Sequence, residues 1–182
     1  MNKDNNRSFR FTISLQYFLY FGIMGITLPY FNLYCYHLDF SGSQIGILSA
    51  LRSVVAVLFS LIWGRLADRF QTRRPIYIIC NFISTAFWVF FLYTTDFHGM
   101  IVVTISYVIF HAPIISFLEA FTMDVLGREK KSYGRIRVWG TLSFIAVSII
   151  LGKAIELYSV KIILILILAG SLLQAIFSLR SP

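Results

Sequence analysis

Long apolar segments alternate with short polar segments along almost the whole chain. Each apolar segment has about the length that a helix needs to cross a hydrocarbon core of about 30 Å, at a rise of about 1.5 Å per residue. The pattern predicts an all-α membrane protein in which residues 1–182 form one bundle of six transmembrane helices. We expect these helices at residues 11–34, 45–66, 76–93, 100–124, 136–155 and 160–179.

The composition agrees with this pattern and excludes a soluble domain. Hydrophobic residues make up 58% of the chain and charged residues only 13%, and the mean hydropathy is +0.76. A soluble domain cannot bury that much apolar surface. The net charge of +8 suggests a nucleic-acid partner at first sight. The basic residues are confined to clusters between apolar segments, however, so we predict a lipid bilayer as partner and no nucleic acid.

The basic clusters predict the orientation of the chain. They lie before the first segment, after the second and after the fourth, at Lys3, Arg7 and Arg10, then Arg65, Arg69, Arg73 and Arg74, then Arg128, Lys130, Lys131 and Arg135. Because positively charged loops stay on the cytoplasmic side, both termini are predicted to be cytoplasmic in a multi-pass protein of the cell membrane. The first apolar segment is too long for a signal peptide and lacks a small-residue cleavage site, so we expect it to be retained.

Two charged residues interrupt the apolar segments on either side of one basic loop. Glu119 lies nine positions before Arg128, and Arg137 lies nine positions after it. In a hairpin of two antiparallel helices this symmetry places both side chains at similar depth and within reach of each other. Charges at membrane depth face a cavity or pair with one another. We interpret the pair as the polar floor of a binding cavity, and a purely structural ion pair of Glu119 with Arg137 or Arg135 is the alternative.

Other residues inside the apolar segments leave two interpretations open. Arg52 precedes Gly64 by about 18 Å of helical rise, so it either reaches to the outer interface or lines a pathway and meets a substrate. His111 is either a hydrogen-bonded structural histidine or a proton carrier. Phe21 and Met24, in the first segment, either face a cavity or pack against another helix.

The loop after the second apolar segment reads GRLADRFQTRRP. A glycine there allows helix ends to cross closely, and basic side chains or a helix N-terminus hold the aspartate. Breaking such a cluster lets helices separate, so it can act as a conformational latch on the cytoplasmic side. The residues of this predicted latch are Gly64, Asp68, Arg69, Arg73 and Arg74.

Enzymatic chemistry is disfavoured by the sequence. A membrane-embedded hydrolase needs a nucleophile and a base on facing helices, yet the chain has no GxSG-like motif and its last apolar segment has no histidine. We expect no catalytic residue, no metal site and no cofactor. Cys35 and Cys80 lie near opposite ends of the predicted bundle, too far apart for a disulfide, and are expected to pack in the core.

Several stretches resemble the major facilitator superfamily. They are YFGIMGITLPYF, GILSALRSVVAVLFSLIWGRLADR, LEAF at Glu119 and GRIRVWG, with the loop described above. They look like the amino-terminal half of lactose permease-like transporters, a group that includes oligosaccharide:proton symporters and phenylpropionate-type permeases. The resemblance implies two inverted three-helix repeats. It also implies a secondary transporter, coupled to protons, for a small solute such as a sugar, a nucleoside or an aromatic or organic acid.

The resemblance assigns roles to individual residues. Glu119 and Arg137 match the acid and the arginine that hold the sugar in this group, and Phe144 matches its stacking aromatic residue. Trp139 lies on the same predicted helix and could add to an aromatic face over a sugar or an aryl ring. Arg52 replaces an apolar residue of the group, which favours an organic anion over a neutral sugar.

Gln71 replaces a glycine of the same group, at a position where a positive φ is expected. The resemblance also implies a second six-helix half, which is either a continuation of the same gene product, a split partner or a second copy of this chain. A non-transporting membrane partner or an inactive fragment of such a transporter is the alternative function.

Overall fold

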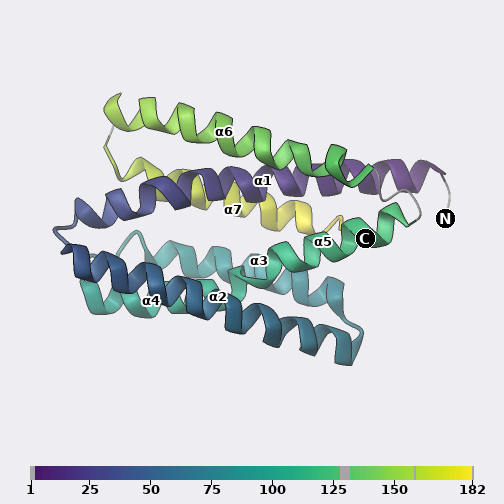
Figure 1. Ribbon diagram of the computed structural model, residues 1–182, viewed down its shortest axis with the longest axis horizontal. Helices are drawn as coiled ribbons and strands as arrows, with labels where there is room; N and C mark the ends of the chain where they lie inside the picture. Colours follow the sequence, from purple (N-terminus) through teal and green to yellow (C-terminus); the bar gives the residue numbers. More distant parts are fainter. Residues whose placement is uncertain (1–2, 128–131, 158, 182) are drawn as a thin grey trace.

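The computed structural model describes residues 3–127, 132–157 and 159–181, which form a bundle of helices without any strand (Figure 1). These residues form α1 (Lys3–Tyr36), α2 (Gly42–Phe70), α3 (Arg73–Phe90), α4 (Phe97–His111), α5 (Pro113–Leu126), α6 (Tyr133–Leu157) and α7 (Ile162–Ser178). Helices α4 and α5 follow each other with only Ala112 between them and act as one span, Phe97–Leu126. The predicted all-α fold with six spans is therefore confirmed.

Four helical stretches of the described chain are long and apolar enough to cross a membrane. They are Phe9–Tyr36, Gly42–Phe70, Phe97–Leu126 and Tyr133–Ile155. Helix α7 is apolar but shorter, and α3 begins with two arginines and buries several polar side chains against its neighbours. The protein is an integral membrane protein. Its spans α3 and α7 are less apolar or shorter than the other four, and contacts with neighbouring helices help to fix their positions.

The packing of the helices follows a repeat of three. Helix α1 packs mainly against α6 and α7, which are the fifth and sixth spans, whereas the α4–α5 span packs mainly against α2 and α3. Exchanging the first three spans with the last three therefore leaves the pattern of neighbours unchanged. In Figure 1, α1 runs away from the end that carries the N-terminus and the α4–α5 span runs towards it. This is the arrangement expected for two inverted three-helix repeats.

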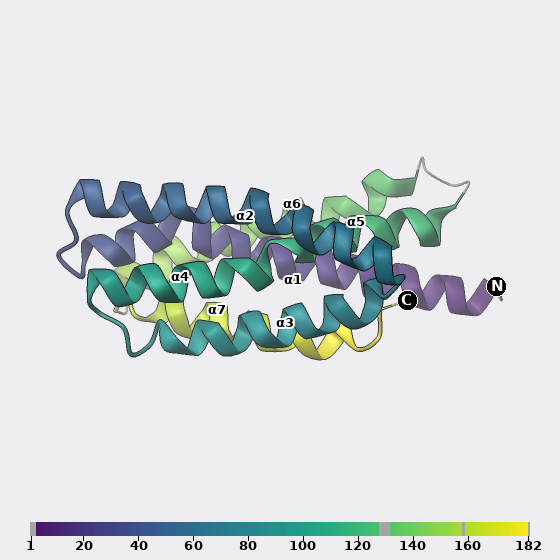
Figure 2. The same cartoon turned by 90° about the horizontal axis from the view of Figure 1, so that it is seen from below.

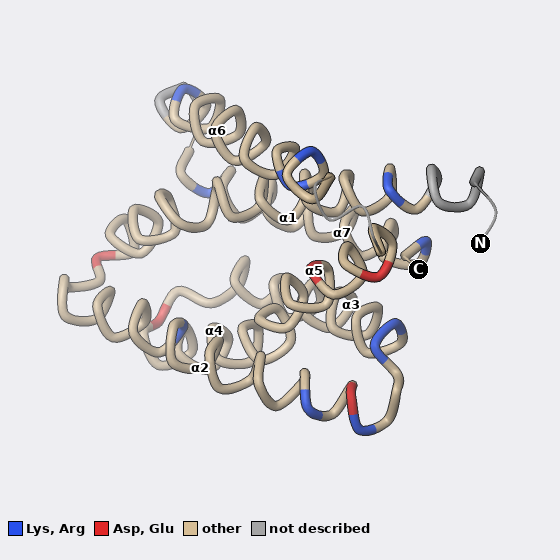
Figure 3. The backbone as a smooth tube through the Cα atoms, turned by 45° about the vertical axis from the view of Figure 1, so that its right-hand side comes forward, with Lys and Arg blue, Asp and Glu red and all other residues tan. Residues whose placement is uncertain are grey.

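Both termini lie at one end of the bundle, together with the α2–α3 and α5–α6 connections (Figures 1 and 2). Figure 3 shows that most of the Lys and Arg residues in the described chain gather at this end, whereas the opposite end carries acidic positions as well as a few basic ones. Arg128, Lys130 and Lys131 lie outside the described residues, as do the side chains of Lys3 and Arg7.

Small residues bring α1 and α6 into close contact. A Cβ atom at Gly25 would lie 2.7 Å from the backbone oxygen of Phe144, and the Ser148 hydroxyl donates a 2.8 Å hydrogen bond to the carbonyl of Gly25. A Cβ atom at Gly140 would likewise lie 2.5 Å from the ring of Phe21. Because lipid tails are as apolar as leucine, such close packing and interhelical hydrogen bonds hold membrane helices together.

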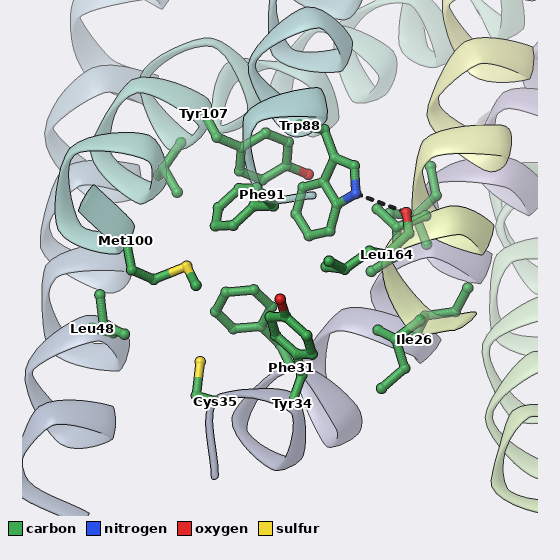
Figure 4. Packing of buried hydrophobic residues seen from close by; sticks show 14 of the residues in the cluster. Ile26, Phe31, Tyr34, Cys35, Leu48, Trp88, Phe91, Met100, Tyr107 and Leu164 are labelled. Atoms are coloured by element: carbon green, nitrogen blue, oxygen red, sulfur yellow. Dashed lines mark hydrogen bonds between the residues drawn. The ribbon is translucent and has the colours of Figure 1, made fainter. Parts of the chain in front are cut away.

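An aromatic cluster packs between α1, α3, α4 and α7 (Figure 4). Trp88 packs on Phe91 with ring centroids 4.5 Å apart, and its indole N–H donates a 3.0 Å hydrogen bond to the carbonyl of Leu164. Cys35 lies in this cluster and Cys80 in a second one nearer the termini, and both are buried free thiols. The expected packing role of the two cysteines is therefore found.

Buried polar side chains tie α7 to the rest of the bundle. The Tyr77 hydroxyl donates to the Gln16 side-chain oxygen at 3.0 Å, and the Gln16 amide donates to the Gln174 carbonyl at 3.2 Å. These bonds link α3, α1 and α7 where no water is available to replace them. They give α7 a fixed position although its sequence is almost uniformly apolar.

We predict that Gly25→Ala destabilises the bundle, because the added methyl group would meet backbone atoms that cannot move aside. The expected loss is about 1–3 kcal/mol of unfolding free energy, measured by denaturation in detergent. The matched control is Gly46→Ala in α2, where a Cβ atom would meet nothing within 4 Å. This control should be neutral or stabilising by up to about 1 kcal/mol. Equal effects of the two substitutions would contradict the close α1–α6 contact.

Candidate functional site

A carboxylate from α5 and a guanidinium from α6 meet on the open face of the bundle. Arg137 Nη1 lies 3.6 Å from Glu119 Oε1, and the exposed fractions of the two side chains are 47% and 42%. Exposed ion pairs of this kind contribute only about 0–1 kcal/mol to stability. The pair is thus not a buried ion pair, since both side chains keep close to half of their surface accessible. Arg135, the alternative partner considered from the sequence, is not the residue that pairs with Glu119.

A tyrosine hydroxyl lies between the two charges. Arg137 Nη1 donates to the Tyr133 hydroxyl at 2.8 Å, and this hydroxyl lies 3.5 Å from Glu119 Oε1. The guanidinium also lies over the Tyr133 ring, 5.7 Å from its centroid. Sequence reasoning missed Tyr133, although its spacing of four residues from Arg137 places the two on one face of a helix.

The aromatic residue Phe21 lies on α1 and meets α6 at Gly140. Its ring stacks on Tyr17 at a centroid distance of 6.2 Å and meets Tyr20 edge-on at 5.5 Å. Tyr17 accepts a 3.3 Å hydrogen bond from the Thr122 hydroxyl of α5. Phe21 is therefore fixed by packing on both sides, above the surface of Gly140.

A cavity of about 390 Å³ lies between α1, α2, α4 and α5. Two residues predicted for the site, Met24 and Arg52, both line it. Its polar lining also includes residues that the sequence did not assign to a site, namely Tyr20, Thr27, Ser60, Tyr107 and Ser116. The volume is at the lower end of the range for small-molecule sites, so the cavity has room for one small solute.

Arg52 lies half-buried in the wall of the cavity. Its guanidinium carbon lies 5.9 Å from the centroid of the Phe31 ring. Among the described residues, no carboxylate lies within ion-pair distance of Arg52. Arg52 lines the cavity, and its role in a solute pathway stays a prediction.

His111 is held between two tyrosine rings at the end of α4. The centroid of its ring lies 5.4 Å from that of Tyr20 and 4.8 Å from that of Tyr107, and both pairs of rings are stacked. The Nε2 atom of His111 is buried and has no hydrogen-bond partner among the described residues. A hydrogen-bonded structural role is therefore not seen for this nitrogen, and a role as proton carrier stays a prediction.

A proline bends the fourth span close to His111. Pro113 has no backbone N–H, so it cannot bond to the carbonyl four residues earlier, at Ile109. The indole N–H of Trp63 on α2 takes this place, with a 2.9 Å hydrogen bond to the Ile109 carbonyl. Satisfying the freed carbonyl makes the bend tolerable in a membrane. Because of this bend, α4 and α5 are separate helices. The axis of α5, and not that of α4, therefore decides where Glu119 lies.

Glu119 and Arg137 do not line the cavity themselves, but residues of α1 and α5 connect their pair with it. Ser116, which lines the cavity, precedes Glu119 by three positions on α5, so both lie on the same side of that helix. Tyr20 lines the cavity, stacks on His111 and lies within electrostatic range of Glu119. The candidate site therefore combines this mixed charge pair with a cavity that contains a single arginine, Arg52.

Trp139 and Phe144, the two aromatic residues predicted for the site on α6, lie outside the cavity lining. Trp139 is 51% exposed on α6, because its neighbour Gly140 faces α1 and successive residues of a helix point about 100° apart. Phe144 approaches Gly25 through its backbone. Neither residue lines the cavity.

Arg73 forms the centre of the predicted latch. Its Nε and Nη2 atoms donate to Asp68 Oδ1 at 3.1 and 2.8 Å, and its Nη1 lies 3.7 Å from Asp124 Oδ2. The hydrogen bonds to Asp68 raise the pKa of Arg73 above its ordinary value. Arg73 thus connects the ends of α2 and α5 to the start of α3. Asp124 was missed in the sequence because it lies far from this loop along the chain.

The other latch residues play different parts. Arg74 donates a 3.1 Å hydrogen bond to the Leu179 carbonyl after α7, whereas Arg69 stays on its own helix, over the ring of Phe70. Gln71 has the positive φ of 53° expected at its position. The close crossing expected at Gly64 is not found, since a Cβ atom there would meet nothing within 4 Å.

The sequence of this chain matches one family model and several curated proteins. The model described as "MFS_1 like family" matches residues 11–181. The protein named "Probable 3-phenylpropionic acid transporter" from Escherichia coli K12 is 25% identical over 162 residues, which cover 87% of this chain and 42% of that protein. The maltose permease of Geobacillus stearothermophilus is 26% identical over 133 residues, covering 71% of this chain and 33% of the permease.

Solved structures show the same fold. The crystal structure of the nucleoside transporter NupG superposes with a TM-score of 0.85 at 22% sequence identity, covering 96% of this chain and 44% of NupG. The D323A mutant of NupG gives a TM-score of 0.86. The chain thus spans less than half the length of these relatives.

We predict that the hydrogen bond from Trp63 matters because Pro113 frees the Ile109 carbonyl. Trp63→Phe should destabilise the parent protein, whereas in a Pro113→Ala background the new N–H at position 113 can satisfy the same carbonyl. A double-mutant cycle measured by thermal denaturation should give a coupling of about 0.5–1.5 kcal/mol. The same cost in both backgrounds would show that the indole N–H is not needed at the bend.

Proposed function

This chain belongs to the MFS_1 like family, within the major facilitator superfamily, and we propose on this premise that it forms the amino-terminal half of a secondary transporter. The transported molecule is a small solute, such as a sugar, a nucleoside or an aromatic or organic acid. The chain supplies one wall of the solute pathway, made by α1, α2, α5 and α6.

The observation that carries this proposal is the exposed pair of Glu119 and Arg137. A membrane protein keeps ionisable side chains in a span where they pair with each other or serve a pathway. This pair is only loosely closed, at 3.6 Å, with the Tyr133 hydroxyl within hydrogen-bond distance of both charges. A carboxylate and a guanidinium together can hold neighbouring hydroxyl groups, and the guanidinium alone can hold a carboxylate.

The opposite wall of the pathway is a second six-helix half. The chain covers only 42% of the phenylpropionic acid transporter and 44% of NupG, and two of its helices present broad apolar surface. On α2 this surface includes Val54, Val57, Leu58, Leu61 and Ile62, and on α6 it includes Leu142, Ile145, Ile149 and Ile150. The second half is a continuation of the same gene product, a split partner or a second copy.

The proposed cycle is alternating access across the cell membrane, with both termini in the cytoplasm. The basic end of the bundle supports this orientation. The contacts of Arg73 with Asp68 and Asp124 hold the ends of α2 and α5 together at the cytoplasmic side. Breaking these contacts lets the two helices separate when the cavity opens inward.

We predict that Glu119→Gln and Arg137→Lys each weaken solute binding by about tenfold or more. Each removes a charge-assisted or bidentate hydrogen bond while leaving the helix intact. The measurement is uptake and equilibrium binding in proteoliposomes with the native gene product. Arg135→Lys is the matched control, because this exposed arginine on the same helix lies outside the site.

Membrane insertion and helicity of the Glu119 and Arg137 variants should equal those of the parent. Unchanged solute binding by both variants would contradict the assignment of Glu119 and Arg137 to the binding site. A different result would indicate a non-transporting membrane partner. In that case the Glu119 and Arg137 variants would have the same effect on cells as the parent protein, and only substitutions in the loops would abolish this effect.

We also predict that uptake is driven by protons, as the resemblance to symporters implies. An inward proton gradient imposed on proteoliposomes should raise the initial rate of uptake, and a protonophore should abolish the increase. The control is the same gradient across liposomes that contain the Arg137→Lys variant. A rate that follows a sodium gradient or no gradient would contradict proton coupling.

A further inference from the structure

Arg52 is a cation in the membrane interior whose counter-ion is missing from the described part of the chain. The guanidinium lies half-buried in the cavity wall, and no described carboxylate is within ion-pair distance. Taking such a charge out of water is costly unless an opposite charge compensates it. The nearby ring of Phe31, 5.9 Å from the guanidinium carbon, compensates only part of that cost.

The remainder of the cavity suits an apolar, flat body. Met24, Ile23, Val108 and Ile115 contribute apolar wall. The stacked rings of Tyr20, His111 and Tyr107 form a rigid aromatic side. Aromatic faces bind flat rings through large contact areas at little cost in conformational entropy. Hydroxyl groups of Thr27, Ser60 and Ser116 lie among these walls.

The charges of the lining limit the ligand further. Among the described residues that line the cavity, Arg52 is the only Lys or Arg. One guanidinium matches one carboxylate in a bidentate pair. A phosphomonoester, with about two negative charges, would leave one of them without a cationic partner in this lining. A neutral polyol would leave Arg52 itself without a counter-ion.

We propose that Arg52 is the carboxylate-binding residue of this cavity and that the transported solute is a small organic monoanion with a flat apolar body. The carboxylate pairs with Arg52, and the body lies along the tyrosine rings towards Ser116. The Glu119 and Arg137 pair then contacts the opposite end of the solute. This inference rests on the proposed transport function and specifies the class of its solute.

The test compares aryl carboxylates with the neutral amides of the same shape. Benzoate, phenylacetate and 3-phenylpropionate, each beside its primary amide, are added to the native gene product in lipid nanodiscs. Binding is measured by thermal stabilisation and by direct titration. At least one carboxylate should bind about ten to a hundred times more tightly than its amide, as expected for a hydrogen bond to a charged group.

Arg52→Gln should remove this preference, and Arg52→Lys should keep the preference with weaker binding, because lysine retains the charge without the planar fork. Arg65→Gln is the matched control, since it removes one positive charge from an exposed position of the same helix. The comparison of acids with amides in the parent protein gives a result even when Arg52→Gln fails to fold.

Equal binding of acids and amides overturns the inference, as does a preference for acids that persists in Arg52→Gln. Failure of every aryl acid to bind overturns it too. The proposed transport function is then tested separately by uptake of neutral solutes such as maltose and uridine. Uptake that is lost in Glu119→Gln would support transport even though the inference about Arg52 has failed.

Discussion

The hydrocarbon interior of a membrane offers no partner for a polar group, and this constraint explains where the polar side chains of the bundle lie. Trp63 supplies the hydrogen bond that Pro113 cannot make to the Ile109 carbonyl. Gln16 and Tyr77 satisfy each other between α1 and α3. Each of these hydrogen bonds joins two helices, α2 with α4 in the first case and α1 with α3 in the second.

The same constraint separates structural polar groups from those of the candidate site. Buried groups such as Gln16 have partners within the bundle, whereas Glu119 and Arg137 are nearly half exposed on an open face. Arg52 has an aromatic neighbour and no described carboxylate partner. The proposed binding of a solute depends on these three charged groups. Thr104, Ser143 and Gln174 each keep a buried polar atom without a described partner as well, but these side chains carry no charge. Helix α1 connects both sets, because it packs on α6 and α7 and also lines the cavity with Tyr20 and Met24.

The sequence predicted the features that depend on length and local order. Apolar length alone predicts six spans, and hairpin symmetry predicts that Glu119 and Arg137 meet. The sequence did not predict which face each helix turns towards its neighbours. Trp139 is exposed and does not line the cavity, whereas Gly140 is the residue that meets α1, and this register depends on the fit to Phe21. The partnership of Arg73 with Asp124 depends on packing between distant segments in the same way.

The most direct test of the central claim, that this chain lines a pathway that opens alternately to both sides, is the accessibility of Ser116→Cys to a membrane-impermeant maleimide. Both native cysteines are buried, so the parent protein gives a low baseline. The account predicts labelling in right-side-out and in inside-out vesicles, with protection by a bound solute in both. Labelling from one side only, or none that a solute alters, would contradict it.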